Sequence, residues 1–522
     1  MAIEPAPSGN WPAAIATRLS DVTGETIPNR ASLLVIPERR RRDELEYADA
    51  CEAHSLWLGP HRRAIGLRAR RVYFVRLGGE IDRRPERMIV GARRPEPLSP
   101  AKQVYTQHAI ARELSGALDH ARFELTSVVS VGCNLAAGHT LRIGAMNHSL
   151  VGTTLDQIYR EHGFDEVPTS ATCSVCPLDG AEQEHAVAFA KRLARVAKAR
   201  GLELRLHVRG PEAAEKRLIE LEGTGEAPRP GMMLVILLPF RAKPCSSAAA
   251  RLLHRLDRAG VPYRRAYVDD PQEFSIPDQV PSILAAVGGR AHRPAAVVRD
   301  GVWLVGVDLS HPASRRHSTL AVTLVDSKGG LRGAWTRRQR LDETPRPESL
   351  RQLLLACREG LSRLEVNAEV LVVRDGRLFE NEDANLYQSV LGARTTLVEL
   401  RKNGNPLIVN GHDVEGPPLA PAVVAVENCN TLFLAARSPV SPMQLPTTAK
   451  LHWDEKFNGL GLSKVELGDL VLASTGAPTL GNRPSLLPSP IYWADGIAGA
   501  SDDDLRFRGQ GAIDLTPAAG CD

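Results

Sequence analysis

The chain has 522 residues, of which 43% are hydrophobic and 24% are charged. The length suits roughly three or four domains, and the proportions are ordinary for a soluble globular protein, so nothing in them calls for a disordered chain. With 65 basic and 61 acidic residues, the net charge of +4 permits nucleic-acid binding but does not argue for it. No apolar run approaches the roughly 18 residues of a membrane span and the start of the chain lacks a signal-peptide core, so we expect a soluble, cytoplasmic protein.

The first 155 residues combine short strand-like runs with basic patches. Residues 1–30 are rich in Pro, Gly and Ser and predict a loose lead-in, whereas apolar runs at 32–36 and 72–77 predict strands. The basic patches lie at residues 39–42, 62–63 and 68–71. Each patch alone is typical of a solvated face, and together they could line a strand of nucleic acid. We expect a mixed α+β region here.

The spacing of apolar residues changes near residue 165 and indicates alternating helices and strands. Amphipathic spacing predicts the helices, two of which end at glycines suited to a C-cap, and apolar runs predict the strands. In chain order these are a helix at 181–199, strands at 202–208 and 231–239, a helix at 247–259, a strand at 261–268 and a helix at 279–287. This alternation favours a parallel, Rossmann-like α/β domain.

The eight cysteines form no recognisable framework. They are scattered through a long chain, which argues against a secreted disulfide scaffold. Cys173 and Cys176 make one CxxC pair with no second pair nearby, which is weak support for zinc. We therefore favour two free thiols at a strand–loop junction.

From residue 301 onward the predicted elements follow another order. They are three strands at 301–309, 317–326 and 331–341, a helix at 347–364 and a strand at 368–373. The short Ser-Lys-Gly-Gly link between the second and third strands predicts an antiparallel hairpin, and Pro347 suits the first turn of the helix. Three antiparallel strands, a helix and a strand beside the first is the order of an RNase H fold.

Two aspartates lie where apolar strands end. Asp308 follows Trp-Leu-Val-Gly-Val, and Asp375 follows Val-Leu-Val-Val-Arg. Burying a carboxylate at such a position is costly unless it is compensated, and the hard ions Mg²⁺ and Mn²⁺ prefer oxygen ligands. Two such ions about 3.5–4 Å apart can activate water and stabilise the leaving oxygen of a phosphodiester. The alternative is that each aspartate caps a strand end or turn, and the similar Arg-Asp-Gly sequence at Asp300 shows how readily that tripeptide occurs elsewhere.

Several segments, in order, resemble the PIWI domain of Argonaute proteins. Gly-Val-Asp-Leu-Ser-His-Pro at 306–312 resembles its first catalytic strand, and Val-Arg-Asp-Gly at 373–376 resembles its second aspartate motif. Between them, 347–361 resembles the segment that carries the family's glutamate. Near the end, 487–498 resembles the closing helix, and 442–453 resembles the strand before it.

The resemblance implies a catalytic set of Asp308, Glu348, Asp375 and Asp495, with Glu343 as the alternative glutamate. It also implies two bound Mg²⁺ or Mn²⁺ ions, with Asp308, Asp375 and Asp495 as metal ligands. The reaction implied is hydrolysis of a phosphodiester by water, without a covalent intermediate.

The resemblance extends to the preceding domain. Residues 161–295 are expected to form a MID domain and residues 296–522 a PIWI domain of the RNase H type, after an N-terminal region at 1–160. In the family, MID and PIWI together hold the 5′ end of a short guide strand, and PIWI cuts a paired target. The implied function is therefore a guide-directed endonuclease, with a role in prokaryotic defence against invading nucleic acid.

The guide-anchoring residues depart from the family pattern. The usual Tyr or His, Lys, Gln and Lys are not found at the matching positions; the basic residues available instead are Arg251, His254, Arg264 and Arg265, with Lys402 further along the chain. Arginine forks bind phosphate well, but these side chains are equally typical of helix surfaces and strand edges. The altered pattern leaves open a guide with a 5′-hydroxyl, and the sequence does not distinguish DNA from RNA.

Two other functions compete with the guided nuclease. The region before the MID domain is expected to be too short for complete N and PAZ domains, and short prokaryotic Argonautes usually sense nucleic acid for a partner effector protein. The second alternative is an RNase H-like nuclease that uses no guide. The four acidic residues favour the guided endonuclease, whereas the altered guide-anchoring pattern lends some weight to the nuclease that uses no guide.

Overall fold

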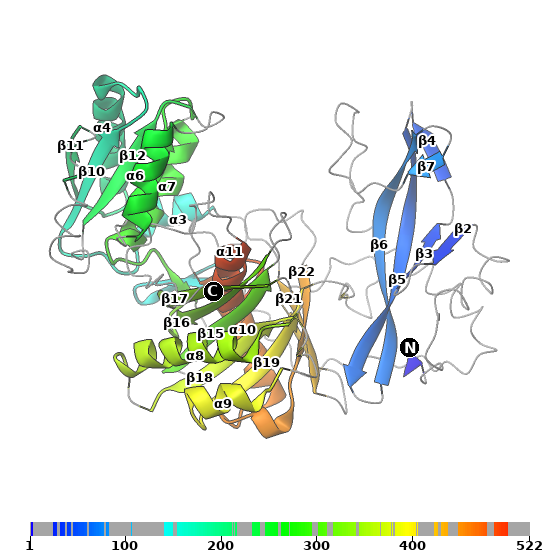
Figure 1. Cartoon of the computed structure of the whole chain (residues 1–522). Helices are drawn as coiled ribbons and strands as arrows, with labels where there is room; N and C mark the ends of the chain where they lie inside the picture. Colours follow the sequence, from blue (N-terminus) through cyan, green and yellow to red (C-terminus); the bar gives the residue numbers. More distant parts are fainter. Residues whose placement is uncertain are drawn as a thin grey trace. The chain divides into compact units, whose positions relative to one another are not determined.

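The structure is a computed structural model of the whole chain (Figure 1). It describes residues 140–149, 154–210, 232–240, 246–258, 263–270, 272–294, 301–310, 317–340, 344–365, 367–376, 382–402, 422–425, 430–436, 447–477 and 485–499. It also describes the strands between residues 2 and 82 and a few isolated residues. The chain divides into unit 1, Met1–Leu135 with Leu400–Trp453, and unit 2, Ala136–Glu399 with Asp454–Asp522. Within the described ranges, no helix is both long and apolar enough to cross a membrane.

Unit 1 is built on a long two-stranded ribbon. Strand β5 (Leu45–Gly59) pairs antiparallel with β6 (Arg62–Leu77), far beyond the predicted strand at 72–77. The register pairs Asp49 with Arg71 and Glu52 with Arg68. The remaining strands are β1 (Ala2–Ile3), β2 (Glu25–Pro28), β3 (Ser32–Ile36), β4 (Arg39–Arg42), β7 (Glu80–Asp82), β20 (Ala422–Ala425), β21 (Thr431–Ala436) and β22 (Thr447–His452).

The first large sheet of unit 2 along the chain is parallel, with the strand order β11-β10-β12-β13. Its strands are β10 (Ala171–Pro177), β11 (Leu204–Val208), β12 (Met232–Leu238) and β13 (Tyr263–Tyr267). Helices α4 (Gln183–Lys198) and α7 (Gln272–Ala286) share a core on one face, and α6 (Ser247–Arg258) packs on the other. Helices on both faces of a parallel sheet confirm the Rossmann-like expectation.

Helix α7 begins seven residues before the predicted start at 279. Pro277 and Pro281 lie inside it and mimic a helix boundary in the sequence. Proline costs roughly 3 kcal/mol within a helix. Burial of Ile276, Val280 and Ile283 on one face outweighs that cost here.

The CxxC pair is not a metal site. Cys173 and Cys176 are three residues apart on β10, so their side chains enter the cores on opposite faces of the sheet. Burial raises the pKa of Cys173, and it raises the pKa of Cys176 to about 11. The structure thus bears out the interpretation as two thiols.

The second large sheet of unit 2 is the RNase H-like sheet, in which β17, β16, β15, β18 and β19 are adjacent in that order. These strands are β15 (Val302–Ser310), β16 (His317–Val325), β17 (Leu331–Arg340), β18 (Glu369–Asp375) and β19 (Thr395–Arg401). β15 pairs antiparallel with β16 and parallel with β18, and β16 pairs antiparallel with β17. The predicted order of three antiparallel strands, a helix and a strand beside the first is confirmed.

Helices cover both faces of this sheet (Figure 1). Helix α8 (Pro347–Ser362) shares a core with β15, β16 and β18, and α11 (Ser489–Gly499) packs on β15 and β16 from the other face. The other described elements of unit 2 are α3 (Leu155–His162), α9 (Asn385–Leu391), α10 (Lys464–Ala473), η2 (Glu455–Phe457), η3 (Ser474–Gly476), β8 (Thr140–Ile143), β9 (Met146–Ser149) and β14 (Arg293–Pro294).

Candidate metal centre

Strand alternation directs Asp308 away from α8. Val305 and Val307 enter the core that α8 covers, so Gly306 and Asp308 lie on the opposite face. A Cβ atom on Gly306 would collide with the main-chain carbonyl of Pro490, at the start of α11. Glycine at this position therefore lets α11 pack directly against β15, on the face that carries Asp308.

A hydrogen bond fixes the start of α11 on the same face. The Thr323 hydroxyl of β16 donates to the carbonyl oxygen of Pro490 over 3.0 Å. Further along the helix, Ile497 and Ala498 pack against Ala321 and Ala334 of the sheet. The helix is thus held at both ends, with Asp495 between them.

Asp375 is placed by the pairing of β18 with β15. The register sets Val307 beside Arg374, so the next residues, Asp308 and Asp375, are neighbours where the parallel pairing of the two strands ends. The chain then turns at Gly376, whose φ of +83° favours glycine. Sequence and register together place both aspartates at one edge of the sheet.

Asp308, Asp375 and Asp495 converge in space. Carboxylate oxygens of the three residues all lie within 4.8 Å of one another, and Asp308 is only 4% exposed. At 4.8 Å, two carboxylates repel by roughly 3.5 kcal/mol at an effective dielectric constant of about 20. An all-oxygen set of three carboxylates offsets that repulsion best by binding a hard divalent cation, so the donor chemistry fits Mg²⁺ or Mn²⁺.

The predicted glutamate is not part of this group. Glu348 lies in the first turn of α8, is exposed, and belongs to the helix on the opposite face of the sheet from Asp308. Glu343 lies outside the described residues. The link from β17 to α8 nevertheless starts at the edge where Asp308 lies, because β17 runs parallel to β15 with β16 between them. The identity of a fourth acid stays a prediction.

Sequence reasoning missed a buried charge directly behind the acids. Arg374 is 3% exposed on β18, and its guanidinium binds Glu382 and donates to the main-chain oxygen of Asp375. Burial lowers the pKa of Arg374, but Glu382, Tyr387 and Asp308 more than offset this, so its pKa is raised. A charged residue within a run of buried valines was the available signal.

The predicted guide-binding residues lie on two elements of unit 2 and, for Lys402, in unit 1. Arg251 is exposed on α6, which also carries His254. On β13, Arg264 donates to the carbonyl oxygens of Tyr263 and Ser282, and Arg265 is half-buried. Lys402 belongs to unit 1. The structure brings Arg264 and Arg265 onto one strand without testing their role.

The start of α6 is occupied by an acid. Asp179 accepts hydrogen bonds from the backbone N–H of Ser246, over 2.8 Å, and from its hydroxyl. The Ser246 hydroxyl in turn accepts from the backbone N–H of Ala249, in the manner of an N-cap. A carboxylate thus already lies at a helix N-terminus, where a phosphate would otherwise be favoured.

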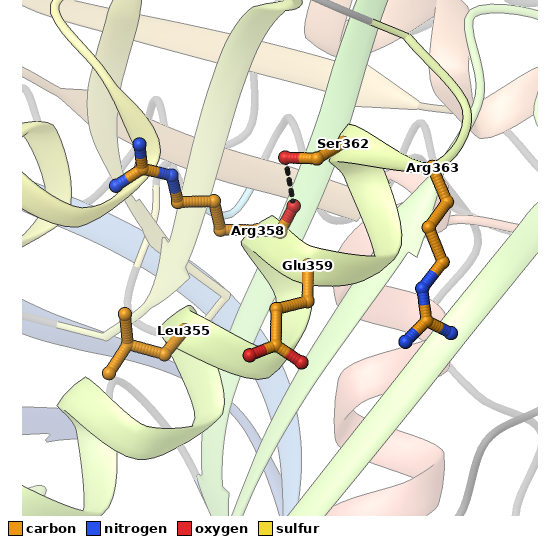
Figure 2. Close-up of a pocket in the computed structure, with 5 residues that line it drawn as sticks. All are labelled: Leu355, Arg358, Glu359, Ser362 and Arg363. Carbon is orange, nitrogen blue, oxygen red and sulfur yellow. Dashed lines mark hydrogen bonds between the residues drawn. The ribbon is translucent and has the colours of Figure 1, made fainter.

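A shallow pocket lies elsewhere, along the outer side of α8 (Figure 2). It has a volume of about 380 Å³ and is lined by Leu355, Arg358, Glu359, Ser362 and Arg363, with Ser362 donating to the carbonyl oxygen of Arg358. Because α8 covers the face opposite the acids, this pocket is not the candidate metal centre.

No protein-family model and no curated protein matches the sequence. Solved structures do match: Marinitoga piezophila Argonaute in complex with 5′-OH guide RNA and target DNA gives a TM-score of 0.63 at 12% identity, covering 94% of this chain and 85% of that one. The chain has the Argonaute fold. Drosophila Piwi gives a TM-score of 0.59 at 12% identity, covering 95% and 84% of the two chains. Aquifex aeolicus Argonaute gives 0.51 at 13% identity, covering 94% and 81%.

Proposed function

We propose that this Argonaute-fold chain is a guide-directed endonuclease that hydrolyses target phosphodiesters with two Mg²⁺ or Mn²⁺ ions. The observation that carries the proposal is the convergence of Asp308, Asp375 and Asp495, whose carboxylate oxygens lie within 4.8 Å of one another. The fold itself supports nucleic-acid binding, since one structural neighbour was solved with a guide RNA and a target DNA.

The residues divide the work as follows. Asp308, Asp375 and Asp495 would hold the ions, which supply a water of lowered pKa and stabilise the leaving oxygen. Buried Asp308 would provide a fixed ligand, and α11 would contribute Asp495. Glu348, or Glu343 in the preceding link, would complete the ligand set. Arg251, His254, Arg264, Arg265 and Lys402 remain candidates for contacts with the guide.

The hypothesis that the protein uses a guide strand is tested first by extracting nucleic acid from the purified protein. Bound short strands of a narrow length range are expected. A protein that carries none, and that cleaves single strands equally well with and without an added guide, would be a guide-independent nuclease.

Cleavage separates the endonuclease from a guided sensor. The protein is incubated with a guide, a complementary target and Mn²⁺, beside an Asp375→Ala variant and a Glu359→Gln control, which alters an exposed acid on α8 away from the site. Wild type and control are expected to cut the target and the Asp375 variant is not. Guide and target binding without cutting by the wild type would instead favour a sensor that acts through a partner effector, and would rule out the proposed activity.

A further inference from the structure

Arg374, Glu382 and Tyr387 form a buried network on the face of the RNase H-like sheet that α8 and α9 cover. The Arg374 guanidinium donates to Glu382 through Nε to Oε1 over 3.1 Å and through Nη2 to Oε2 over 3.3 Å. The Tyr387 hydroxyl of α9 donates to Oε1 of the same carboxylate over 2.6 Å. All three side chains are at most 6% exposed. We call this set the Arg374 network.

Stability alone does not account for this network. Arg374 and Glu382 give up hydration, and replacing such a buried pair by packed apolar residues is often neutral or stabilising. The neighbouring strand positions Val370 and Val372 show that apolar residues fill this face. The buried ion pair of Arg374 and Glu382 therefore points to a role that an apolar residue cannot perform.

That role is visible in the contacts of Arg374 with the acidic cluster. Its Nη1 donates to the main-chain oxygen of Asp375, the last residue of β18. Its side chain lies on the opposite face of the strand from that of Asp375, so it contacts the main chain of Asp375 from the face that does not carry the carboxylate. Its positive charge also interacts with Asp308.

We propose that Arg374 is a positioning residue for the metal centre: held by Glu382 and Tyr387, it fixes the end of β18 so that the Asp375 carboxylate stays directed at Asp308 and Asp495, and its charge reduces their mutual repulsion. This inference rests on the proposed metal-dependent function. Arg374 touches neither metal nor substrate and acts through Asp375.

Changes to the network should therefore weaken metal binding without removing a ligand. Outer-shell partners of metal ligands typically change affinity by about 10–100-fold when mutated, and we expect a rise of that size in the Mn²⁺ dissociation constant for Arg374→Gln. Arg374→Lys keeps the charge but not the fork, so its effect should be smaller. Tyr387→Phe removes one hydrogen bond and keeps the packing, so it should weaken binding by a few-fold, roughly as expected for about 1 kcal/mol.

The experiment is Mn²⁺ titration of the full chain, without guide or target, by calorimetry and by electron paramagnetic resonance of free Mn²⁺. Val390→Ala is the matched control, because Val390 is a buried apolar residue on α9 in the same core. Thermal unfolding is measured for every variant, so that a general loosening of the core is recognised.

The expected result is weaker Mn²⁺ binding in the three network variants and unchanged binding in Val390→Ala at a similar loss of unfolding temperature. Network variants that bind Mn²⁺ as wild type does, or that lose no more affinity than Val390→Ala, would overturn the positioning role and leave the proposed function intact. A wild type that binds no Mn²⁺ would defeat the proposed function itself. If Arg374→Gln does not fold, Arg374→Lys and Tyr387→Phe decide the question.

Discussion

Replacing Asp308 by Asn should stabilise the metal-free protein and abolish its stabilisation by Mn²⁺. Asp308 is a buried member of a cluster of three carboxylates whose oxygens lie within 4.8 Å of one another, so the change removes two of the three repulsive pairs. At that distance each pair costs roughly 3.5 kcal/mol at a dielectric constant of about 20 and roughly 0.9 kcal/mol in bulk water.

Asp308 also makes favourable interactions that Asn only partly replaces, including that with Arg374. A lost hydrogen bond to a charged group costs about 1.5–3 kcal/mol. We therefore expect a net gain of about 1–2 kcal/mol in the free energy of unfolding in EDTA. In Mn²⁺ at a hundred times its dissociation constant, wild type should gain about 2.7 kcal/mol and the variant almost nothing.

The assay is thermal and urea unfolding of wild type, Asp308→Asn and Glu359→Gln, in EDTA and in Mn²⁺. The order of stability should reverse between the two conditions for Asp308→Asn, and the exposed α8 control should follow wild type in both. An Asp308 variant that is less stable than wild type in EDTA, yet gains as much from Mn²⁺, would refute the reasoning that this cluster is strained by charge and relieved by a cation.

Three further outcomes follow from the structure. Gly306→Ala should destabilise the fold by about 1–3 kcal/mol, since the new Cβ meets the carbonyl of Pro490. It should also weaken Mn²⁺ binding by displacing α11, and unchanged affinity in a calorimetric titration would count against the packing of α11 on Gly306. Burial lowers the pKa of His292 to about 3, so between about pH 6.5 and pH 3 only the unfolded state binds a proton at this residue. The free energy of unfolding measured with urea should therefore fall by roughly 1.4 kcal/mol for each pH unit below about 6.5, about 2 kcal/mol by about pH 5. His292→Gln should flatten that slope. Asp179→Asn should raise affinity for a 5′-phosphorylated guide relative to a 5′-hydroxyl guide in filter binding, because the carboxylate occupies the start of α6; an unchanged ratio would place the guide end elsewhere.

The sequence predicted the RNase H-like part of the protein well because its signals are local. Apolar runs marked β15 and β18, helical spacing marked α8, and each aspartate directly follows or ends such a run. Parallel strands end at one edge of a sheet, so the meeting of Asp308 and Asp375 could be anticipated. Asp495 was expected only from the resemblance of residues 487–498, and the structure places it beside the other two aspartates.

What the sequence did not predict depends on contacts between elements distant in the chain. The long β5–β6 ribbon was missed because its many charged residues interrupt the apolar alternation that marks a strand. The need for Gly306 appears only when α11, nearly two hundred residues later, is packed against it. The link of Arg374 to Glu382 and Tyr387 likewise requires the fold, since nothing in their spacing marks them as partners.

The most direct measurement is the position of the cut in an end-labelled target. A series of guides that pair with the same target, each shifted along it by a fixed number of nucleotides, is loaded into the protein in Mn²⁺. The account predicts a single cut that moves with the guide by the same number of nucleotides and disappears in Asp375→Ala. A cut whose position ignores the guide, or that persists in Asp375→Ala, would contradict it.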